Sequence, residues 1–411
     1  MSVTFTPSPR RILVRGVNWL GDAVMTTPAL LRLREKFPAA HITLLGPEKL
    51  ADLWEHHPAV DEVISIQAGE GVFSVGEKLR SHKASLAPTG GEGRGEGATS
   101  PCKFDLALVL PNSPRSALEA FLAGIPRRIG YSRPWRNFFL TQAAASRAGA
   151  VKMRKKTVAE IQRLVAQPLG SAGVPPVAWA EDAGETPALL SSAHQIHEYL
   201  HLVAALGANP EPLAPQLAVT TEEIEAVKKK FGLENEKDTG GTPVPLFGLN
   251  PGAEYGPAKR WPAEKFIAAA KEIQERTNCT WLIFGGKGDI ELAGRIAVEI
   301  GNRKSEIRNV SGQTSLRELM ALLKLCRVLL TNDTGPMHVA AALDTPVVVP
   351  FGSTSPELTG PGLPGDSRHR LLKSDAPCSP CFLRDCPIDF RCMNGIPVER
   401  VVEAVRAAQS R

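Results

Sequence analysis

The sequence predicts an α/β protein of two domains, each built on a parallel β-sheet. Three observations support this fold class. The chain has 411 residues, which exceeds the roughly 250–300 residues that one core usually reaches. Apolar strand-like runs alternate with helix-like segments, a pattern typical of parallel sheets covered by helices. The alternation begins again in the second half of the chain, so we expect two similar halves that face a cleft.

The elements follow in order from the apolar runs and the turn residues between them. In the first half, strands are expected at residues 12–14, 41–45, 62–66 and 104–110, and helices at Ala23 to Lys36 and after Pro114. In the second half, strands are expected at 245–249, 280–284, 307–310, 327–331 and 346–350, and helices near 263–277, 288–301, 315–325 and 335–343. The domains are placed at 1–212 and 213–411.

Three stretches interrupt this pattern. Residues 85–101, 166–190 and 234–244 are rich in Gly, Ala or Pro, a composition typical of surface excursions. We predict that all three are insertions without a catalytic role.

Composition limits the location and the partners. There is no apolar run of 18 residues, so no transmembrane helix is expected. The first residues lack the apolar core of a secretory signal, and a cytoplasmic location is therefore expected.

The charge of the chain is concentrated in one window. The net charge of the chain is only +5, but residues 103–165 hold twelve Lys or Arg against three Asp or Glu. This basic window is either a solvated face or a surface for an anionic partner. It carries no nucleic-acid-binding signature, whereas an anionic lipid surface or a phosphorylated acceptor fits it.

The most informative stretch is Asn250-Pro-Gly-Ala-Glu-Tyr-Gly-Pro-Ala-Lys-Arg-Trp261, between an expected strand and an expected helix. Gly252 and Gly256 let the backbone approach a ligand and expose its N–H groups. Lys259 and Arg260 add positive charge. The loop suits a pyrophosphate, although an ordinary strand-to-helix connection with exposed cations is the alternative.

Other strand-to-helix junctions also carry polar groups. Asp22, after Gly21, is either an N-cap or a carboxylate that accepts a proton from a sugar hydroxyl. In Thr331-Asn-Asp-Thr-Gly-Pro-Met-His338, Asp333 and Thr334 offer oxygens, and Gly335 opens a helix whose free N–H groups suit a phosphate. His338 either lines the ligand or packs in the core. Asp289, after a Gly-rich turn, suits a ribose.

Seven cysteines, an odd number, argue against a disulfide framework. Four of them, Cys378, Cys381, Cys386 and Cys392, lie close together in the sequence. Four thiolates can close a tetrahedral zinc site. A structural zinc and free or redox-active thiols are therefore the two interpretations.

Taken together, these motifs resemble the ADP-heptose:lipopolysaccharide heptosyltransferases of glycosyltransferase family 9, and the 251–262 string resembles their type II members most. The stretches that carry the resemblance are Gly21-Asp22, Val109–Ser113, Phe121–Pro126, Pro251–Pro262 and Thr331–Ala342. They run in family order over most of the chain. The resemblance implies a GT-B fold, in which two Rossmann-like domains face a central cleft.

The resemblance also implies the substrates. The N-terminal domain would bind a heptosylated Kdo–lipid A acceptor at the inner face of the inner membrane, which adds a peripheral membrane association. The C-terminal domain would bind ADP-heptose. No nucleic acid is implied, and the oligomeric state stays open. The alternatives are another family 9 transferase, of type I or III or with another sugar donor, and a nucleotide-sugar-binding protein that has lost catalysis.

The site residues follow from the same resemblance. Asp22 would be the catalytic base and Lys259 would neutralise the leaving ADP, so that the chemistry requires no cofactor. Donor-binding residues would be Glu254, Tyr255, Gly256, Lys259, Asp289, Thr314, Asp333, Thr334, Gly335 and His338. Acceptor-binding residues would be Asn18, Asn112, Ser113, Arg115, Arg133 and Arg136, with Arg127 and Arg128 on the same basic window.

Overall fold

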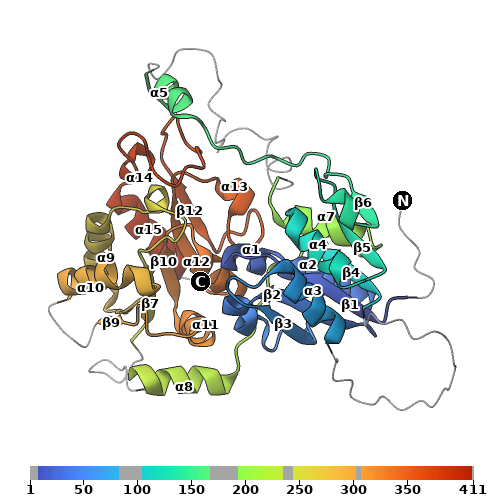
Figure 1. The fold of residues 1–411 in the computed structure, drawn as a ribbon. Coiled ribbons are helices and arrows are strands. Elements are labelled where there is room, and N and C mark those ends of the chain that lie inside the picture. The colour runs from blue at the N-terminus through green and yellow to red at the C-terminus, as the bar shows by residue number, and fades with distance from the viewer. Residues whose placement is uncertain (1–7, 83–103, 167–192, 235–243, 302–306, 410–411) are drawn as a thin grey trace, which may run out of the picture. The chain divides into compact units, whose positions relative to one another are not determined.

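Two compact units make up the computed structural model of the chain (Figure 1). The structure describes residues 8–82, 104–166, 193–234, 244–301 and 307–409. The N-terminal unit comprises Met1–Ala148 and Ile196–Pro212, and the C-terminal unit comprises Gly149–Gln195 and Leu213–Arg411. The predicted insertions at 85–101, 166–190 and 234–244 lie almost wholly outside the described residues.

The division of the chain differs from the expected domains at one segment. The boundary between residues 212 and 213 is where we placed it, but Gly149–Gln195 belongs to the C-terminal unit. Local contacts explain this. Lys156 donates its backbone N–H to Cys381 O at 3.0 Å, and Ile161 packs with Cys378 and Cys381. These partners are distant in sequence, so no local pattern could have indicated them.

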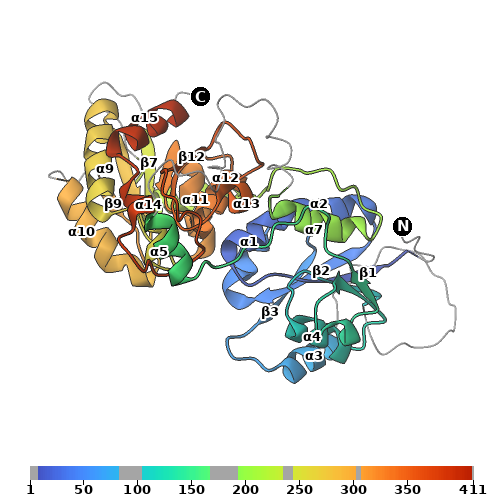
Figure 2. The same ribbon diagram turned by 90° about the horizontal axis from the view of Figure 1, so that it is seen from above.

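The N-terminal unit is a six-stranded parallel sheet in the order β3-β2-β1-β4-β5-β6. Its strands are β1 (Arg11–Arg15), β2 (His41–Pro47), β3 (Glu62–Ile66), β4 (Leu106–Val109), β5 (Arg127–Tyr131) and β6 (Gln142–Ala144). Its helices are α1 (Leu20–Met25), α2 (Thr27–Lys36), α3 (Val72–Ser81), α4 (Pro114–Leu122) and α7 (Ile196–Ala204), with 3₁₀ turns η1 (Glu48–Trp54) and η2 (Asn137–Phe139). Figure 2 shows α1, α2 and α7 on one face of the sheet and α3 and α4 on the other.

The C-terminal unit repeats this topology. Its sheet has the order β12-β11-β10-β7-β8-β9, again parallel throughout. Its strands are β7 (Leu246–Asn250), β8 (Thr280–Ile283), β9 (Ile307–Asn309), β10 (Val328–Thr331), β11 (Val347–Phe351) and β12 (Arg370–Lys373). Counted along each unit, both sheets therefore share the doubly wound order 3-2-1-4-5-6.

Helices cover both faces of the second sheet as well. The helices of this unit are α5 (Val158–Ala166), α8 (Thr221–Phe231), α9 (Ala263–Thr277), α10 (Ile290–Ile300), α11 (Leu316–Leu325), α12 (Gly335–Ala342), α13 (Pro356–Thr359), α14 (Arg391–Asn394) and α15 (Val398–Gln409), with 3₁₀ turns η3 (Pro257–Lys259) and η4 (Lys287–Asp289). A core of α9, α10 and α15 residues packs on one face of the sheet, around Phe247, Trp261 and Trp281. No helix among the described residues is long and apolar enough to cross a membrane.

The helix expected from Ala23 to Lys36 is broken at Thr26 into α1 and α2. The cause is Pro28, which lies in the first turn of α2 and has no N–H for a bond to Val24 O. The hydroxyls of Thr26 and Thr27 donate instead to Ala23 O at 2.7 Å and Val24 O at 2.8 Å. The break leaves Asp22 in a short helix of its own.

Candidate functional site

The strongest candidate site lies where the strand order of the C-terminal sheet reverses. β7 and β10 are neighbours there, and the loops that follow them leave the same edge of the sheet. Ligands bind at such switch points in doubly wound sheets. Lys259 on the first loop places its Nζ 2.7 Å from Asp333 Oδ2 on the second, and the two side chains are 15% and 5% exposed. The structure thus brings together the lysine and the aspartate that the sequence singled out separately.

Asn332 fixes the two loops to each other. Its side chain is buried, accepts the Trp261 N–H at 2.9 Å and donates to Pro251 O at 2.8 Å. Trp261 is buried in turn and donates its indole N–H to Ile396 O at 3.2 Å. One amide thus holds both ends of the 251–261 loop. The sequence analysis had not singled out Asn332, although its place between a strand and Asp333 was a usable signal.

Tyr255 and Gly256 lie in the turn of this loop that precedes Lys259, and a second segment supports them. The Tyr255 hydroxyl donates to Phe382 O at 2.9 Å, and burial raises its pKa. Gly256 has φ of 153°, and a Cβ there would lie 2.6 Å from Arg384 O. Glycine is therefore required by a close backbone approach. Residues 382–384 were missed by the sequence analysis, because nothing local links them to residue 256.

Asp289 also lies against the 251–261 loop. A Cβ on Gly252 would come within 2.6 Å of the Asp289 carboxylate, so the glycine makes room for it. The carboxylate accepts the Gly286 N–H at 3.1 Å, and Arg260 lies 3.7 Å from it. Asp289 is therefore held next to the candidate site. Thr314 is half-buried in the loop before α11, which Ser315 caps, and its role in donor binding stays a prediction.

The start of α12 lies beside Asp333. Thr334 is the N-cap residue without a side-chain capping bond, and Gly335 and Pro336 form the first turn. Thr354, another residue that the sequence analysis missed, donates its hydroxyl to Asp333 Oδ2. His338 is buried, and burial lowers its pKa to about 4, so it is neutral at pH 7. Whether it contacts the donor stays a prediction.

In the N-terminal unit, Asp22 lies at the equivalent junction between β1 and α1. It is in the first turn of α1, whose N-cap is Trp19, so the N-cap interpretation of Asp22 is wrong. The helix N-terminus stabilises a carboxylate at this position. Trp19 and Asn18 are exposed in the loop before it, and Lys49 lies 5.5 Å over the Trp19 ring.

A buried ion pair lies beneath this junction. Arg15 at the end of β1 places its Nε 2.7 Å from Glu119 Oε2, with the two side chains 7% and 0% exposed. Arg115 binds the other carboxylate oxygen of Glu119 at 3.1 Å. Arg15 also reaches Asn18 Oδ1 at 3.4 Å. The network therefore connects the β1–α1 loop to α4.

The remaining acceptor candidates divide into capping, surface and buried residues. Ser113 caps α4, and Arg133 donates to Ser146 Oγ at 2.9 Å near the surface. Arg136 departs from the expectation of an arginine that faces the acceptor. It is fully buried and donates to Asn112 Oδ1 at 3.2 Å, and burial lowers its pKa to about 10. Its guanidinium therefore orients Asn112.

The cysteine cluster does not form a closed metal site in the structure. The four thiols are free, and three of them are buried. Cys386 Sγ accepts the Phe390 N–H at 3.2 Å. Within the described part of the chain no three of these thiols lie within 4.8 Å of one another, whereas Zn–S bonds of about 2.3 Å would require S–S separations of roughly 3.8 Å.

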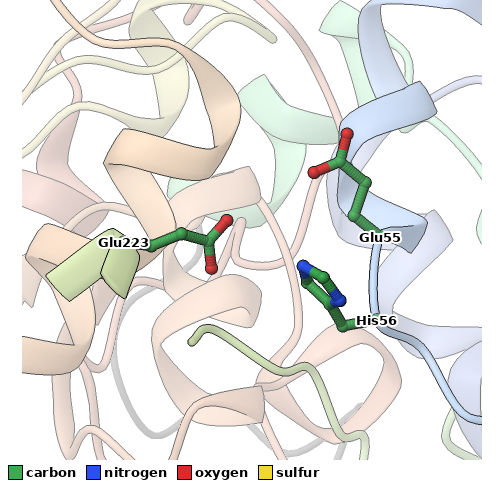
Figure 3. A group of neighbouring side chains, drawn as sticks. All are labelled: Glu55, His56 and Glu223. Atoms are coloured by element: carbon green, nitrogen blue, oxygen red, sulfur yellow. The ribbon is translucent and has the colours of Figure 1, made fainter. Parts of the chain in front are cut away.

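Three further side chains with metal-binding chemistry, Glu55, His56 and Glu223, are drawn in Figure 3. Glu55 and His56 follow η1 in the N-terminal unit. Glu223 belongs to α8 of the C-terminal unit, where it completes a capping box with Thr220 and binds Arg317. Because Glu223 already has these partners within its own unit, the three side chains are assigned to no common site.

Comparison with known proteins places these features in context. A family model described as glycosyltransferase family 9 (heptosyltransferase) matches residues 186–390. Lipopolysaccharide heptosyltransferase 2 of Salmonella typhimurium is 31% identical over 353 residues, which cover 85% of each chain. The protein of the same name from Escherichia coli is 31% identical over 376 residues, which cover 89% of this chain and 91% of that protein.

Solved structures give the same picture. The structure of E. coli ADP-heptose lps heptosyltransferase II is 26% identical, has a TM-score of 0.69 and covers 97% of this chain and 98% of its own. A glycosyl transferase family 9 structure from Veillonella parvula has a TM-score of 0.70 at 22% identity, with 98% and 97% covered, which shows a common fold.

Proposed function

The chain belongs to glycosyltransferase family 9, and from this premise we propose that it transfers L-glycero-D-manno-heptose from ADP-heptose to the heptosylated Kdo–lipid A of the lipopolysaccharide inner core. The similarity to relatives named heptosyltransferase 2 extends over most of both chains. Similarity of this extent supports the same donor and the same acceptor.

One observation supports the proposal most directly: the Lys259–Asp333 pair at the switch point of the C-terminal sheet. ADP leaves with negative charge on its β-phosphate, and a fixed cation stabilises that charge as it develops. Lys259 supplies the cation, and the Gly335 N–H at the start of α12 adds a hydrogen-bond donor. Asp333 accepts hydrogen bonds from heptose hydroxyls, and Asp289 from the ribose. In this proposal the lysine replaces a divalent metal as the neutralising charge.

The proposed reaction is one inverting displacement. An acceptor oxygen forms a bond to the anomeric carbon of heptose while the bond from that carbon to the β-phosphate oxygen breaks. Asp22 takes the proton of the acceptor hydroxyl, and the electron pair of the broken bond stays on ADP. An ionised carboxylate is required for this step, and the position of Asp22 in the first turn of α1 favours that form.

On the acceptor side, we propose roles for Asn18, Asn112, Ser113, Arg115 and Arg133. Arg136, which is buried, acts through Asn112. The phosphates and carboxylates of a lipid A–Kdo acceptor match the basic window. Trp135 and Phe138, which are 78% and 80% exposed, flank this region. Exposed aromatic rings next to arginines support a peripheral association with the cytoplasmic face of the inner membrane.

The proposal is tested by supplying ADP-heptose with either Kdo₂-lipid A or its monoheptosylated form and following ADP release. Turnover with the monoheptosylated acceptor alone is expected. Turnover with Kdo₂-lipid A alone would instead assign the first heptose addition. If ADP binds but neither acceptor is glycosylated, the chain is a nucleotide-sugar-binding protein.

A structural zinc at the four cysteines is a separate proposal. Four thiols close in sequence, three of them buried, support it, while their present spacing does not. The expected result is about one zinc per chain by elemental analysis of the purified protein, lost in a Cys378→Ser variant. Metal-free protein in which all four thiols react would show that the cysteines are free thiols and do not bind zinc.

A further inference from the structure

Arg384 lies against the 251–261 loop and is held there by its own backbone. Its carbonyl oxygen accepts the Ala258 N–H at 2.9 Å, and Gly256 leaves room for that oxygen. Two residues earlier, Phe382 O accepts the Tyr255 hydroxyl at 2.9 Å. The backbone of residues 382–384 is therefore joined to the same turn that carries Lys259.

Two cations flank the ring of Tyr255. Lys259 Nζ lies 5.0 Å from the ring centroid, and Arg384 Cζ lies 5.7 Å from it. Both distances fall within the range of cation–π contacts, about 6 Å. The tyrosine thus keeps the guanidinium beside the turn that carries the lysine.

The two cations differ in their anionic partners. Lys259 is paired with Asp333 at 2.7 Å, so part of its charge is already neutralised before a ligand arrives. Arg384 is exposed, and the described part of the chain places no carboxylate within ion-pair distance of it. A guanidinium presents a fork of N–H donors that matches phosphate oxygens in pairs. Arg384 is therefore a cation beside this turn that is available to an incoming phosphate.

We propose that Arg384 is a second diphosphate-binding residue, which contacts the ADP part of the donor together with Lys259. This inference rests on the proposed function, because it takes the 251–261 loop as the diphosphate site. A diphosphate carries more charge than one lysine neutralises. The guanidinium neutralises the additional negative charge of the diphosphate, both in the bound donor and as ADP leaves.

The experiment uses the full chain and measures the dissociation constants of ADP and AMP by titration calorimetry. Arg384→Gln removes the charge but keeps the backbone carbonyl that binds Ala258, so the fold and the Tm should not change. ADP affinity should fall roughly 10- to 100-fold, the range for a charge-assisted hydrogen bond. AMP, which lacks the β-phosphate, should lose about threefold or less. Arg384→Lys should recover part of the ADP affinity.

Arg391→Gln is the matched control. Arg391 lies in the same segment but is paired with Asp389 at 3.0 Å, so its loss should leave ADP affinity unchanged. Unchanged ADP affinity in Arg384→Gln, or equal losses for ADP and AMP, would overturn the proposal.

The wild type is titrated with UDP and GDP in parallel. If the wild type binds UDP or GDP more tightly than ADP, the proposed donor is wrong. Arg384 would still be a diphosphate-binding residue if Arg384→Gln weakened the binding of that preferred diphosphate and left the binding of its monophosphate unchanged. A wild type that binds no nucleoside diphosphate would overturn both proposals.

Discussion

The N-terminal and C-terminal units share one strand order but use the switch point differently. In the N-terminal unit, the pair at the end of β1, Arg15 and Glu119, is buried and connects the loop to a helix. In the C-terminal unit, the loops after β7 and β10 form the pair of Lys259 and Asp333, in which Asp333 is buried and Lys259 is still 15% exposed. The comparison teaches that the same topology places an ion pair at the switch point of both units, and in our proposal only the pair with the more exposed cation binds a ligand.

The largest effect is expected for Asp22→Asn in the N-terminal unit. Removing the proton acceptor should lower kcat by roughly 10²- to 10⁴-fold and leave ADP affinity unchanged, because the C-terminal unit binds the donor. Steady-state kinetics and calorimetry measure the two quantities. Near-native turnover with normal ADP binding would show that Asp22 is not the base.

A comparable effect, on stability, is expected for Glu119→Gln. The substitution leaves Arg15 buried without its carboxylate, which typically costs about 3–5 kcal/mol, although the amide oxygen keeps one acceptor. Denaturant unfolding measures the free energy of unfolding. Glu225→Gln, which breaks an exposed pair with Lys228, is the control and should change little. Equal losses in the free energy of unfolding for the two variants would show that the buried pair contributes no more to stability than the exposed pair.

Lys259→Gln tests the other half of the comparison. It should lower kcat roughly 10²- to 10³-fold, because the charge on the departing ADP loses a fixed cation, while the free energy of unfolding changes much less than in Glu119→Gln. Lys271→Gln, an exposed lysine of α9, should leave both quantities unchanged. Severe destabilisation without a rate effect would make Lys259 a structural residue.

Acid should weaken the C-terminal unit more steeply than the N-terminal unit. Burial lowers the pKa of His338 and His369 in the former, and of His57 in the latter, to about 4. Below about pH 6.5 the unfolded chain binds protons that the folded chain does not. The stability that these neutral histidines contribute is therefore fully present above about pH 6.5 and is lost as the pH falls toward about 4.

Hydrogen exchange of peptides from each unit at pH 7.5 and 5.5 measures this difference. His369→Gln should flatten the pH dependence of the C-terminal unit. If the stability of both units of the wild type fell equally with pH, the assignment of this pH dependence to the buried histidines would be wrong.

The smallest effect is expected for Arg133→Glu. Reversing this charge should raise the KM for the acceptor about threefold to tenfold by weakening its attraction, and leave the KM for ADP-heptose unchanged. The effect should shrink at high salt. An unchanged acceptor KM would exclude Arg133 from the acceptor surface.

The sequence predicted strong, locally bounded elements well. The helix over Ala263–Thr277 was placed at its observed ends, because Pro262 precedes it and Asn278, with φ of 51°, ends it. β5 was missed because it begins with two arginines, β12 because charged residues stand at both of its ends, and β6 because it has only three residues. Short or charged strands become extended because they pair with neighbouring strands. Their own sequences carry no hydrophobic periodicity that would predict a strand.

The sequence by itself determined the fold class, the family and the loops that carry Asp22, Lys259 and Asp333, because glycines, charges and apolar runs in those loops are local signals. Only the tertiary structure decided their partners: Asp333 for Lys259, Asn332 for the two ends of the loop, and Arg384 beside Tyr255. It also decided that Arg136 is buried. Burial and pairing depend on residues that are distant along the chain, and they arise when the parallel sheet brings strand ends to one edge.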